Sequence, residues 1–238
     1  MSNPKQVVLL RRLRAFWGIA HLAVLLLSAI KSQAAAQLFT EYPNIFGTSN
    51  PAYSISGVLW GNYENGNIDI LLLRQTGVLQ FRVGPANQLP SATQITNTPI
   101  VKDLTGVPNS GAWADYNNDS QLDVFISKTW SAPDTNTLNA LYRGTANNFT
   151  NITLQSLGTN LFKGSGCAWA DFDRDGWLDL FVASASDSNG VCYLYHNNNG
   201  DGTFTRMLAA GSIVTDHWNA YGCAWGDYDN DGWPDLFV

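Results

Sequence analysis

Charged side chains are scarce in this sequence. Asp, Glu, Lys and Arg together make up 13% of its 238 residues, whereas apolar residues make up 45% and aromatic residues 12%. This composition excludes an intrinsically disordered chain, which needs high charge and few aromatic side chains. Acidic residues outnumber basic ones by 19 to 13. Because phosphate binding requires a basic surface, we predict a globular protein that does not bind nucleic acid.

Cysteine is also scarce. The chain has three cysteines, which are Cys167, Cys192 and Cys223. An odd number forms no closed disulfide framework, so we interpret these residues as small buried side chains. A single disulfide that involves Cys192 is kept as an alternative for an oxidising compartment.

Residues that would support catalysis are few. Of the three histidines, His21 lies in an N-terminal apolar run and His196 is interpreted as a strand-end residue. His217, beside Asp216 in a long loop, is the one unusual candidate. The sequence contains no nucleophile elbow, no zinc-protease motif and no phosphate-binding loop. We therefore predict no catalytic residue and no enzyme activity for this chain.

The N-terminal 36 residues differ from the rest. They hold five basic residues and no acidic one, and they contain the apolar run AFWGIAHLAVLLLSAI from Ala15 to Ile30, followed by Ala34–Ala36. A basic region, an apolar region and a small-residue site in that order are typical of a secretory signal peptide. The run is shorter than the roughly 20 residues of a membrane-spanning helix. We predict cleavage after Ala36 rather than a retained anchor, which leaves no stable membrane span and a secreted, periplasmic or cell-surface protein.

One motif recurs along the remaining chain. The copy GCAWADFDRDGWLDLFV starts at Gly166 and returns as GCAWGDYDNDGWPDLFV at Gly222; a shorter copy starts at Gly111 and a degenerate one at Gly57. Successive marker tryptophans are 53, 56 and 56 residues apart, and they are Trp60, Trp113, Trp169 and Trp225. A repeat of this period suggests a propeller or a repeat array.

Each repeat is predicted to form about four short strands. No amphipathic helix of 10–15 residues fits the sequence after residue 36. In the run DLFV, Leu180 and Val182 would point to one face, and Asp179 and Phe181 to the other. Because the strand is apolar on both faces beyond Asp179, we expect it to lie between neighbouring sheets. The fold class is therefore all-β, a partial β-propeller of four-stranded blades.

These repeats define the predicted organisation of the chain. The segments are a signal peptide at 1–36, an N-terminal segment with a candidate ring-closing strand at 37–56, a degenerate repeat 1 at 57–110, repeat 2 at 111–165, repeat 3 at 166–221 and a truncated repeat 4 at 222–238.

An acidic loop inside each motif has the pattern of a cation site. In repeat 3, carboxylates occupy positions 1, 3, 5 and 9, glycine occupies position 6, and position 7 offers a backbone carbonyl. Ca²⁺ prefers six to eight such oxygen ligands, and without a cation the carboxylates would repel one another. An EF-hand is disfavoured, because it needs flanking helices and a Glu at position 12, which here is Ile126, Val182 or Val238 in an apparent strand. Thrombospondin-type or dockerin-like repeats are also disfavoured, because their acidic loops lie closer together and lack intervening strands.

We predict two calcium sites and a third, weaker one. The ligands of repeat 3 are Asp171, Asp173, Asp175, Trp177 and Asp179. Those of repeat 4 are Asp227, Asp229, Asp231, Trp233 and Asp235. The weaker site, where Asn117 replaces an aspartate and Ser120 replaces the glycine, comprises Asp115, Asn117, Asp119, Gln121 and Asp123. Repeat 1 keeps only Asn62, Glu64 and Asp69 at a shortened spacing, and little or no binding is expected there.

The full motif, Gly-x-x-Trp-x-Asp-Tyr/Phe-Asp-x-Asp-Gly-x-x-Asp-Leu-Phe-Val, resembles the FG-GAP/VCBS repeat. That repeat occurs in integrin α-chain propellers, in secreted bacterial proteins and in the cartilage acidic protein group. The resemblance covers residues 57–238 and implies that the loop joins the first two strands of a blade, binds Ca²⁺ and belongs to a seven-bladed propeller. The sequence holds three blades and the opening of a fourth, so we expect it to be the N-terminal fragment of a longer protein.

Two functions remain open at this point. The first is a secreted, calcium-stabilised scaffold that binds or adheres to an extracellular protein or polysaccharide. The alternative is the propeller part of an extracellular enzyme, a polysaccharide lyase or hydrolase, whose catalytic residues lie outside this sequence. Because no catalytic motif is found, the first function is favoured.

Overall fold

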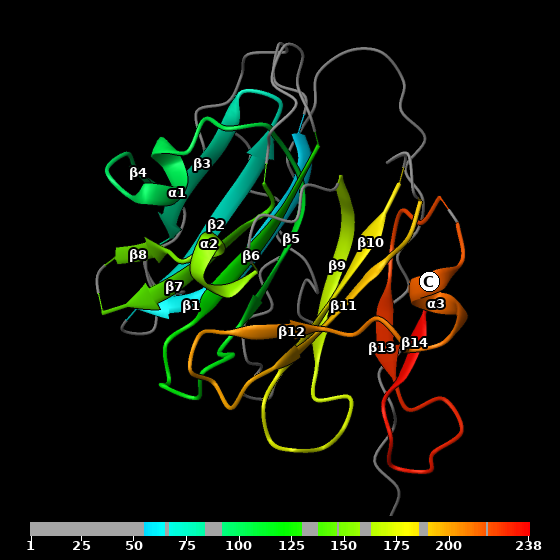
Figure 1. Cartoon of the computed structure of the whole chain (residues 1–238). Coiled ribbons are helices and arrows are strands. Elements are labelled where there is room, and N and C mark those ends of the chain that lie inside the picture. Colours follow the sequence, from blue (N-terminus) through cyan, green and yellow to red (C-terminus); the bar gives the residue numbers. More distant parts are fainter. Residues whose placement is uncertain are drawn as a thin grey trace, which may run out of the picture.

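The computed structural model describes residues 55–64, 67–83, 92–129, 138–146, 148–157, 163–185, 190–217 and 219–238. Over these residues the chain consists of antiparallel sheets joined by short helical turns (Figure 1). This architecture confirms the predicted all-β class and the blades of a partial propeller. The predicted signal peptide and most of the segment at 37–56 lie outside the described residues.

Three sheets repeat one topology, in which four strands follow one another in chain order. Sheet 1 contains β1 (Ile55–Glu64), β2 (Asn67–Arg74), β3 (Gly77–Val83) and β4 (Ala92–Ile95). Sheet 2 contains β5 (Val107–Ala114), β6 (Asp123–Thr129), β7 (Ala140–Thr145) and β8 (Asn148–Asn151). Sheet 3 contains β9 (Gly164–Ala170), β10 (Asp179–Ser184), β11 (Tyr193–Asn197) and β12 (Phe204–Arg206). Sheet 4 contains β13 (Ala224–Gly226) and β14 (Asp235–Phe237).

A four-residue helix follows the last strand of each four-stranded sheet. These helices are α1 (Pro99–Lys102), α2 (Thr153–Ser156) and α3 (Ser212–Thr215). They are too short to show a helical period in the sequence, and none was predicted. None of the helices in the described part of the chain is long and apolar enough to cross a membrane.

Successive sheets meet along their first strands, so that β5 lies beside both β1 and β9, and β13 lies beside β9. Ser56 donates a hydrogen bond from its Oγ to the carbonyl of Pro108 over 2.7 Å. A Cβ atom built on Gly166 would lie 2.8 Å from the Cα of Gly222 and 3.0 Å from the carbonyl oxygen of Tyr221. Gly166, which opens the third motif, therefore lets sheets 3 and 4 approach closely at this point.

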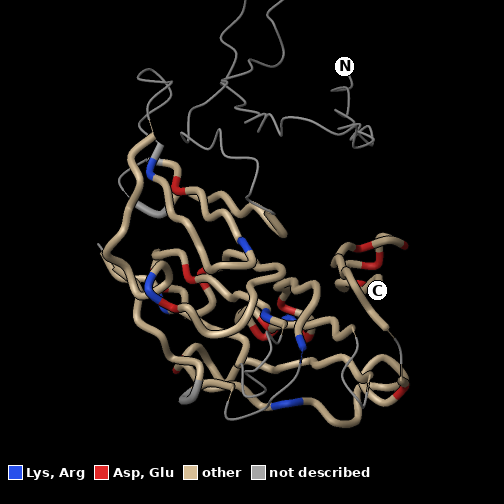
Figure 2. The backbone as a smooth tube through the Cα atoms, turned by 90° about the horizontal axis from the view of Figure 1, so that it is seen from above, with Lys and Arg blue, Asp and Glu red and all other residues tan. Residues whose placement is uncertain are grey.

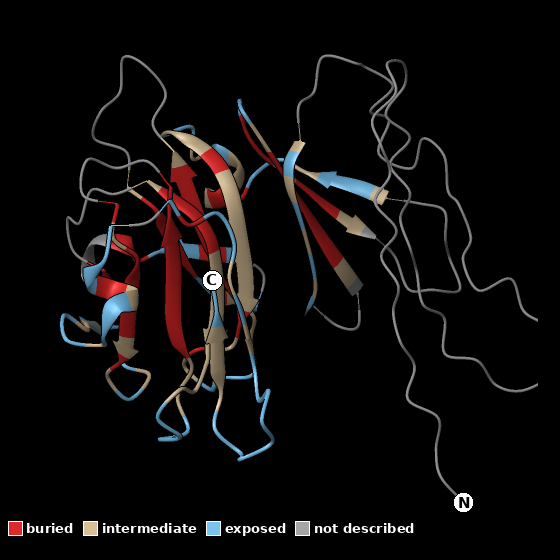
Figure 3. Cartoon of the chain, turned by 90° about the vertical axis from the view of Figure 1, so that its right-hand side faces the viewer, coloured by how far each residue is buried: buried red, intermediate tan, exposed pale blue. Residues whose placement is uncertain are grey.

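The hydrophobic core is divided among the spaces between the sheets. The second strands β6 and β10 are buried along almost their whole length (Figure 3). On β10, Leu180 and Val182 pack with residues of sheet 2, whereas Phe181 packs with Trp225 and Leu236 of sheet 4. This confirms the prediction that the strand is apolar on both faces. Burial of each such side chain contributes about 1.5–3 kcal/mol to folding.

The link between sheets 1 and 2 is fixed by a buried ion pair. The Nζ atom of Lys128 on β6 lies 2.6 Å from Oδ2 of Asp103, which follows α1. The hydroxyl of Tyr142 donates to the same oxygen, and Lys128 also donates to Thr105. Burial alone would raise the pKa of Asp103, but the Lys128 ammonium and these hydrogen bonds outweigh it and lower the pKa below its usual value. The network anchors the link to sheet 2.

The cysteines lie in the core between the sheets. Cys192 is buried, and Cys167 and Cys223 are partly buried. Burial raises the pKa of the Cys223 thiol to about 11 and also raises the pKa of Cys167. These thiols are therefore protonated at neutral pH, which agrees with their interpretation as small buried side chains.

Candidate metal centre

Three acidic loops occupy equivalent places, each between the first and second strands of a sheet. We name them loop 2 (residues 115–123), loop 3 (171–179) and loop 4 (227–235), after their repeats. Figure 1 shows all three at the same edge of the molecule, at the bottom of the view. In Figure 2 the chain near the C-terminus carries red segments and no blue one, since residues 219–238 include no Lys or Arg. A local counter-charge for loop 4 must come from elsewhere.

The backbone of loop 3 is wrapped around its own carboxylates. Asp171 accepts hydrogen bonds from the N–H groups of Asp175 and Gly176, over 3.0 and 2.9 Å. Asp173 accepts from the same Asp175 N–H over 3.3 Å, and Asp175 accepts from Trp177 over 2.9 Å. Each carboxylate at positions 1, 3 and 5 is thus held by at least one backbone donor of the loop.

Loops 2 and 4 repeat this hydrogen-bonding pattern. In loop 4, Asp227 accepts from positions 5 and 6 over 3.0 and 2.9 Å. In loop 2, Asp115 accepts from the corresponding groups over 2.9 and 2.8 Å. Both positions 4 and 6 have a positive φ in all three loops, which is 67° at Ser120 and 92° at Gly176. Ser120 thus keeps the shape of the loop, but in a conformation that favours glycine.

The aspartate at position 9 ties the loop to the third strand of its sheet. Asp179 is fully buried and accepts hydrogen bonds from the N–H groups of Phe172 and Asn197 over 3.0 and 2.9 Å. Asp123 of loop 2 accepts likewise from Tyr116 and Gly144. Burial raises the pKa of Asp179 to about 6 and of Asp123 to about 7, against the opposing effect of these N–H groups. A bound cation would favour the ionised form of both.

The donor atoms of loops 3 and 4 fit a hard cation. Ligand oxygens of Asp171, Asp173 and Asp179 lie within 4.8 Å of one another. Those of Asp227, Asp229 and Asp235 do so in loop 4. A compact set of carboxylate oxygens on a tight loop is the chemistry that Ca²⁺ requires.

Loop 2 carries a less anionic set, and among the described residues its carboxylates form no group of three with ligand oxygens within 4.8 Å. Asn117 takes the place of a fourth carboxylate, and its side-chain amide donates to Oδ2 of Asp119 over 3.0 Å. The positions of Gln121 and Asp123 in the loop match those of Trp177 and Asp179 in loop 3. Fewer negative charges give a weaker attraction for a divalent cation.

Sheet 1 has no corresponding loop in its described residues, because β1 and β2 remain paired as far as Glu64 and Asn67. Asn62 and Asp69 therefore lie in strands. Asp69 is buried, and its Oδ1 is 3.4 Å from Nε of Arg82 on β3. An ion pair within the sheet thus takes the place of a cation for this carboxylate.

Adjacent loops also touch one another. The amide of Asn118 at position 4 of loop 2 donates to the carbonyl of Gly176 in loop 3 over 3.1 Å. The guanidinium of Arg174, at position 4 of loop 3, lies 4.9 Å from the ring centroid of Trp233 in loop 4. Trp177 instead packs on Gly200 in the turn between β11 and β12. Position 4 thus connects each loop to the next along the edge.

The structure adds one residue that was not predicted for this site. His196 on β11 places Nε2 at 2.9 Å from Oδ2 of Asp173 and 3.5 Å from Oδ2 of Asp175. Spacing along the sequence does not reveal this contact, because the contact joins the third strand of the sheet, β11, to the loop that precedes the second strand, β10. The available signal was Arg143, the basic residue at the same place in sheet 2. His217, in contrast, is exposed after α3.

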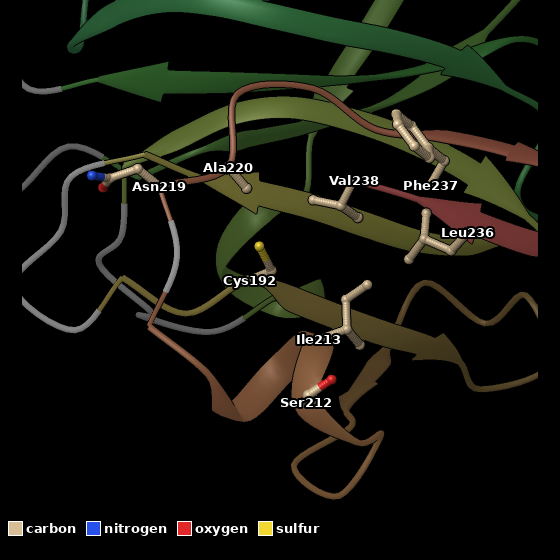
Figure 4. A pocket seen from close by; sticks show the side chains of 8 residues that line it. All are labelled: Cys192, Ser212, Ile213, Asn219, Ala220, Leu236, Phe237 and Val238. Atoms are coloured by element: carbon tan, nitrogen blue, oxygen red, sulfur yellow. The ribbon is translucent and has the colours of Figure 1, made fainter.

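A cavity of about 360 Å³ lies between sheet 3 and sheet 4 (Figure 4). Its lining is mainly apolar and includes Cys192, Ile213, Leu236 and Val238. No acidic, basic or histidine side chain lines it. It therefore offers no acid–base pair for catalysis.

Comparison with known protein families gives two matches, at residues 115–182 and 171–238, and both are to the FG-GAP-like repeat. Each match begins at position 1 of one acidic loop and ends in or just after the second strand of the following sheet. Together they cover just over half of the chain. No curated protein matches the sequence. With its acidic loops and four-stranded sheets, the chain belongs to the FG-GAP-like repeat family.

Proposed function

We propose that this chain is a calcium-stabilised scaffold, part of a propeller that binds an extracellular protein or polysaccharide. One observation carries the proposal: the same self-wrapped acidic loop occurs three times at equivalent places in successive sheets. Repeats of this family typically form non-catalytic scaffolds, usually outside the cell. A structural cation and an exposed loop edge fit such a role.

The residues of loop 3 would each supply a different part of the ion site. Asp171, Asp173 and Asp175 would supply carboxylate oxygens from positions already set by backbone donors. Trp177 would add its backbone carbonyl, and Asp179 would connect the ion site to β11 through Asn197. Ca²⁺ supplies the positive charge that lets these carboxylates stay ionised side by side. Loop 4 would act in the same way, and loop 2 more weakly.

An extracellular location suits such sites. At about 1 mM Ca²⁺ and a Kd of about 10–100 μM, each site would add about 1.4–2.7 kcal/mol to the free energy of unfolding. The predicted signal peptide at residues 1–36 would deliver the chain to that environment. Calcium would then stabilise the folded scaffold only after export.

A thermal melt with and without a calcium chelator tests the proposal. We expect EGTA to lower the Tm by several degrees and calcium to restore it, because the ion binds only the folded loops. The Asp171→Asn variant should lose part of this shift, whereas Asp216→Asn, an exposed change outside the loops, should keep all of it. An unchanged Tm in EGTA, together with no calcium in the purified protein by mass spectrometry, would refute the calcium role.

A further inference from the structure

We propose that loop 3 carries a second metal site on its outer side, formed by Asp173, Asp175 and His196, for a borderline divalent ion such as Zn²⁺. One ligand atom of each residue lies within 4.8 Å of the others. This inference rests on the proposed function, because it uses the same conformation of loop 3. It does not require calcium to occupy the loop.

The two carboxylates present separate oxygens to the backbone and to the histidine. Oδ1 of Asp173 accepts from the N–H of Asp175, and Oδ1 of Asp175 accepts from that of Trp177. In both residues it is Oδ2 that faces Nε2 of His196, over 2.9 and 3.5 Å. Ligand atoms around a tetrahedral Zn²⁺, with bonds of about 2.0–2.2 Å, lie about 3.3–3.6 Å apart. Both distances to Nε2 of His196 therefore lie within about half an ångström of the spacing that the ion needs.

The imidazole is held in place independently of the carboxylates. His196 lies within β11, where it is paired with Thr205 of β12. Its ring meets the ring of Phe172 edge-on, with centroids 6.2 Å apart. Phe172 is itself fixed, because its N–H donates to the buried Asp179. A nitrogen ligand on a strand and two oxygen ligands on a fixed loop form a preorganised site.

The site is open to ions from solvent. The side chains of His196, Asp173 and Asp175 are 28%, 35% and 31% exposed. Three protein ligands with access to water match the common arrangement in which water fills the fourth position on Zn²⁺. Such a site admits a metal without any rearrangement of the core.

The nitrogen ligand determines which ion is favoured. Calcium takes oxygen ligands almost exclusively, whereas imidazole suits Zn²⁺ and other first-row transition ions. The same place in sheet 2 holds Arg143, which is permanently charged and cannot coordinate a metal. Loop 3 therefore differs from loop 2 in the kind of ion that its outer side accepts.

Cobalt(II), a spectroscopic substitute for Zn²⁺, provides the test. The full chain, expressed without an affinity tag, is titrated with Co²⁺ while visible absorption is recorded. We expect one Co²⁺ to bind with the intense bands of a four- or five-coordinate site, and Zn²⁺ to displace it. His196→Arg, which copies the residue of sheet 2, should weaken binding about tenfold or more. His217→Asn removes an exposed histidine elsewhere and should leave the bands unchanged.

The same variants separate this inference from the calcium role. If loop 3 holds both functions as proposed, His196→Arg keeps the calcium-dependent shift in Tm while it loses the cobalt bands. Equal cobalt affinity in the wild type and His196→Arg, or no bands at millimolar Co²⁺, would overturn the second site. If the cobalt bands appear but EGTA does not change the Tm, the calcium role is refuted and the second site is supported.

Discussion

Single residues in the loops show what the fold demands of the sequence. Position 6 has a positive φ in all three loops, and glycine fills it in loops 3 and 4 but serine in loop 2. A side chain in this region of φ and ψ costs about 1 kcal/mol relative to glycine. Loop 2 thus keeps the shape of the other loops, but Ser120 at position 6 holds a strained backbone conformation.

A reciprocal exchange at position 6 tests this strain. Ser120→Gly should raise the stability of the calcium-loaded protein, and Gly176→Ser should lower it, each by about 1 kcal/mol. A Cβ atom on Gly176 meets no atom within 4 Å, so only the backbone conformation is affected. Urea unfolding in saturating calcium gives both values. Shifts of the same sign in the two variants would contradict the explanation.

Residue-level reasoning from the sequence succeeds where a pattern is local. The alternation of Asp171, Asp173 and Asp175 before a glycine was enough to predict a tight acidic loop, because its candidate ligands lie within nine residues. His196 was assigned only to a strand end, because its partners lie more than 20 residues away on another element. The contact between Lys128 and Asp103 was not predicted for the same reason.

At the scale of elements, the strands were predictable and the helical turns that link successive sheets were not. The run from Asp179 to Val182 predicted a strand buried on both faces, and Phe181 and Leu180 indeed pack against different sheets. The four-residue helices after β4, β8 and β12 escaped prediction, since four residues show no period. The anchoring of the link after α1 depends on groups from two other strands.

Removal of the anchoring carboxylate should therefore destabilise the fold. Asp103→Asn leaves Lys128, whose side chain is 2% exposed, as a buried charge without its ion-pair partner. We expect a loss of about 3 kcal/mol at pH 7, measured by urea unfolding. The double variant Asp103→Leu with Lys128→Met should recover most of it, because no unpaired charge remains. A loss of less than about 1 kcal/mol in the single variant would argue against the anchor.

The effect of Asp103→Asn should also depend on pH. The folded protein holds the pKa of Asp103 below its usual value, so its contribution is complete at neutral pH. That contribution is lost as the pH falls below about 4, through the lowered pKa. The stability difference between wild type and variant should hence be constant near neutral pH and narrow in acid. A difference that widens in acid would contradict the sign of the shift.

At the scale of the whole molecule, close approach between blades depends on small residues. A Cβ atom on Gly166 would lie 2.8 Å from the backbone of Gly222, whereas one on Gly222 would meet nothing within 4 Å. Gly166→Ala must therefore push sheets 3 and 4 apart, at a cost of about 1–3 kcal/mol. Gly222→Ala is the matched control and should change stability little. Thermal melts followed by circular dichroism measure the Tm of both variants. Equal Tm values would refute the role of Gly166 in the close approach of the sheets.

The contacts between loops have a consequence for how the molecule would respond to its surroundings. Asn118 reaches loop 3, and Arg174 reaches loop 4, so no loop can change shape without disturbing a neighbour. If calcium occupies the loops as proposed, a fall in its concentration would empty loop 2 first, because its candidate ligand set is the least anionic, and the contacts would pass the change to loops 3 and 4. The conformation of the three loops would therefore change gradually and jointly with calcium concentration, beginning at the weakest site, and the loops would not respond independently.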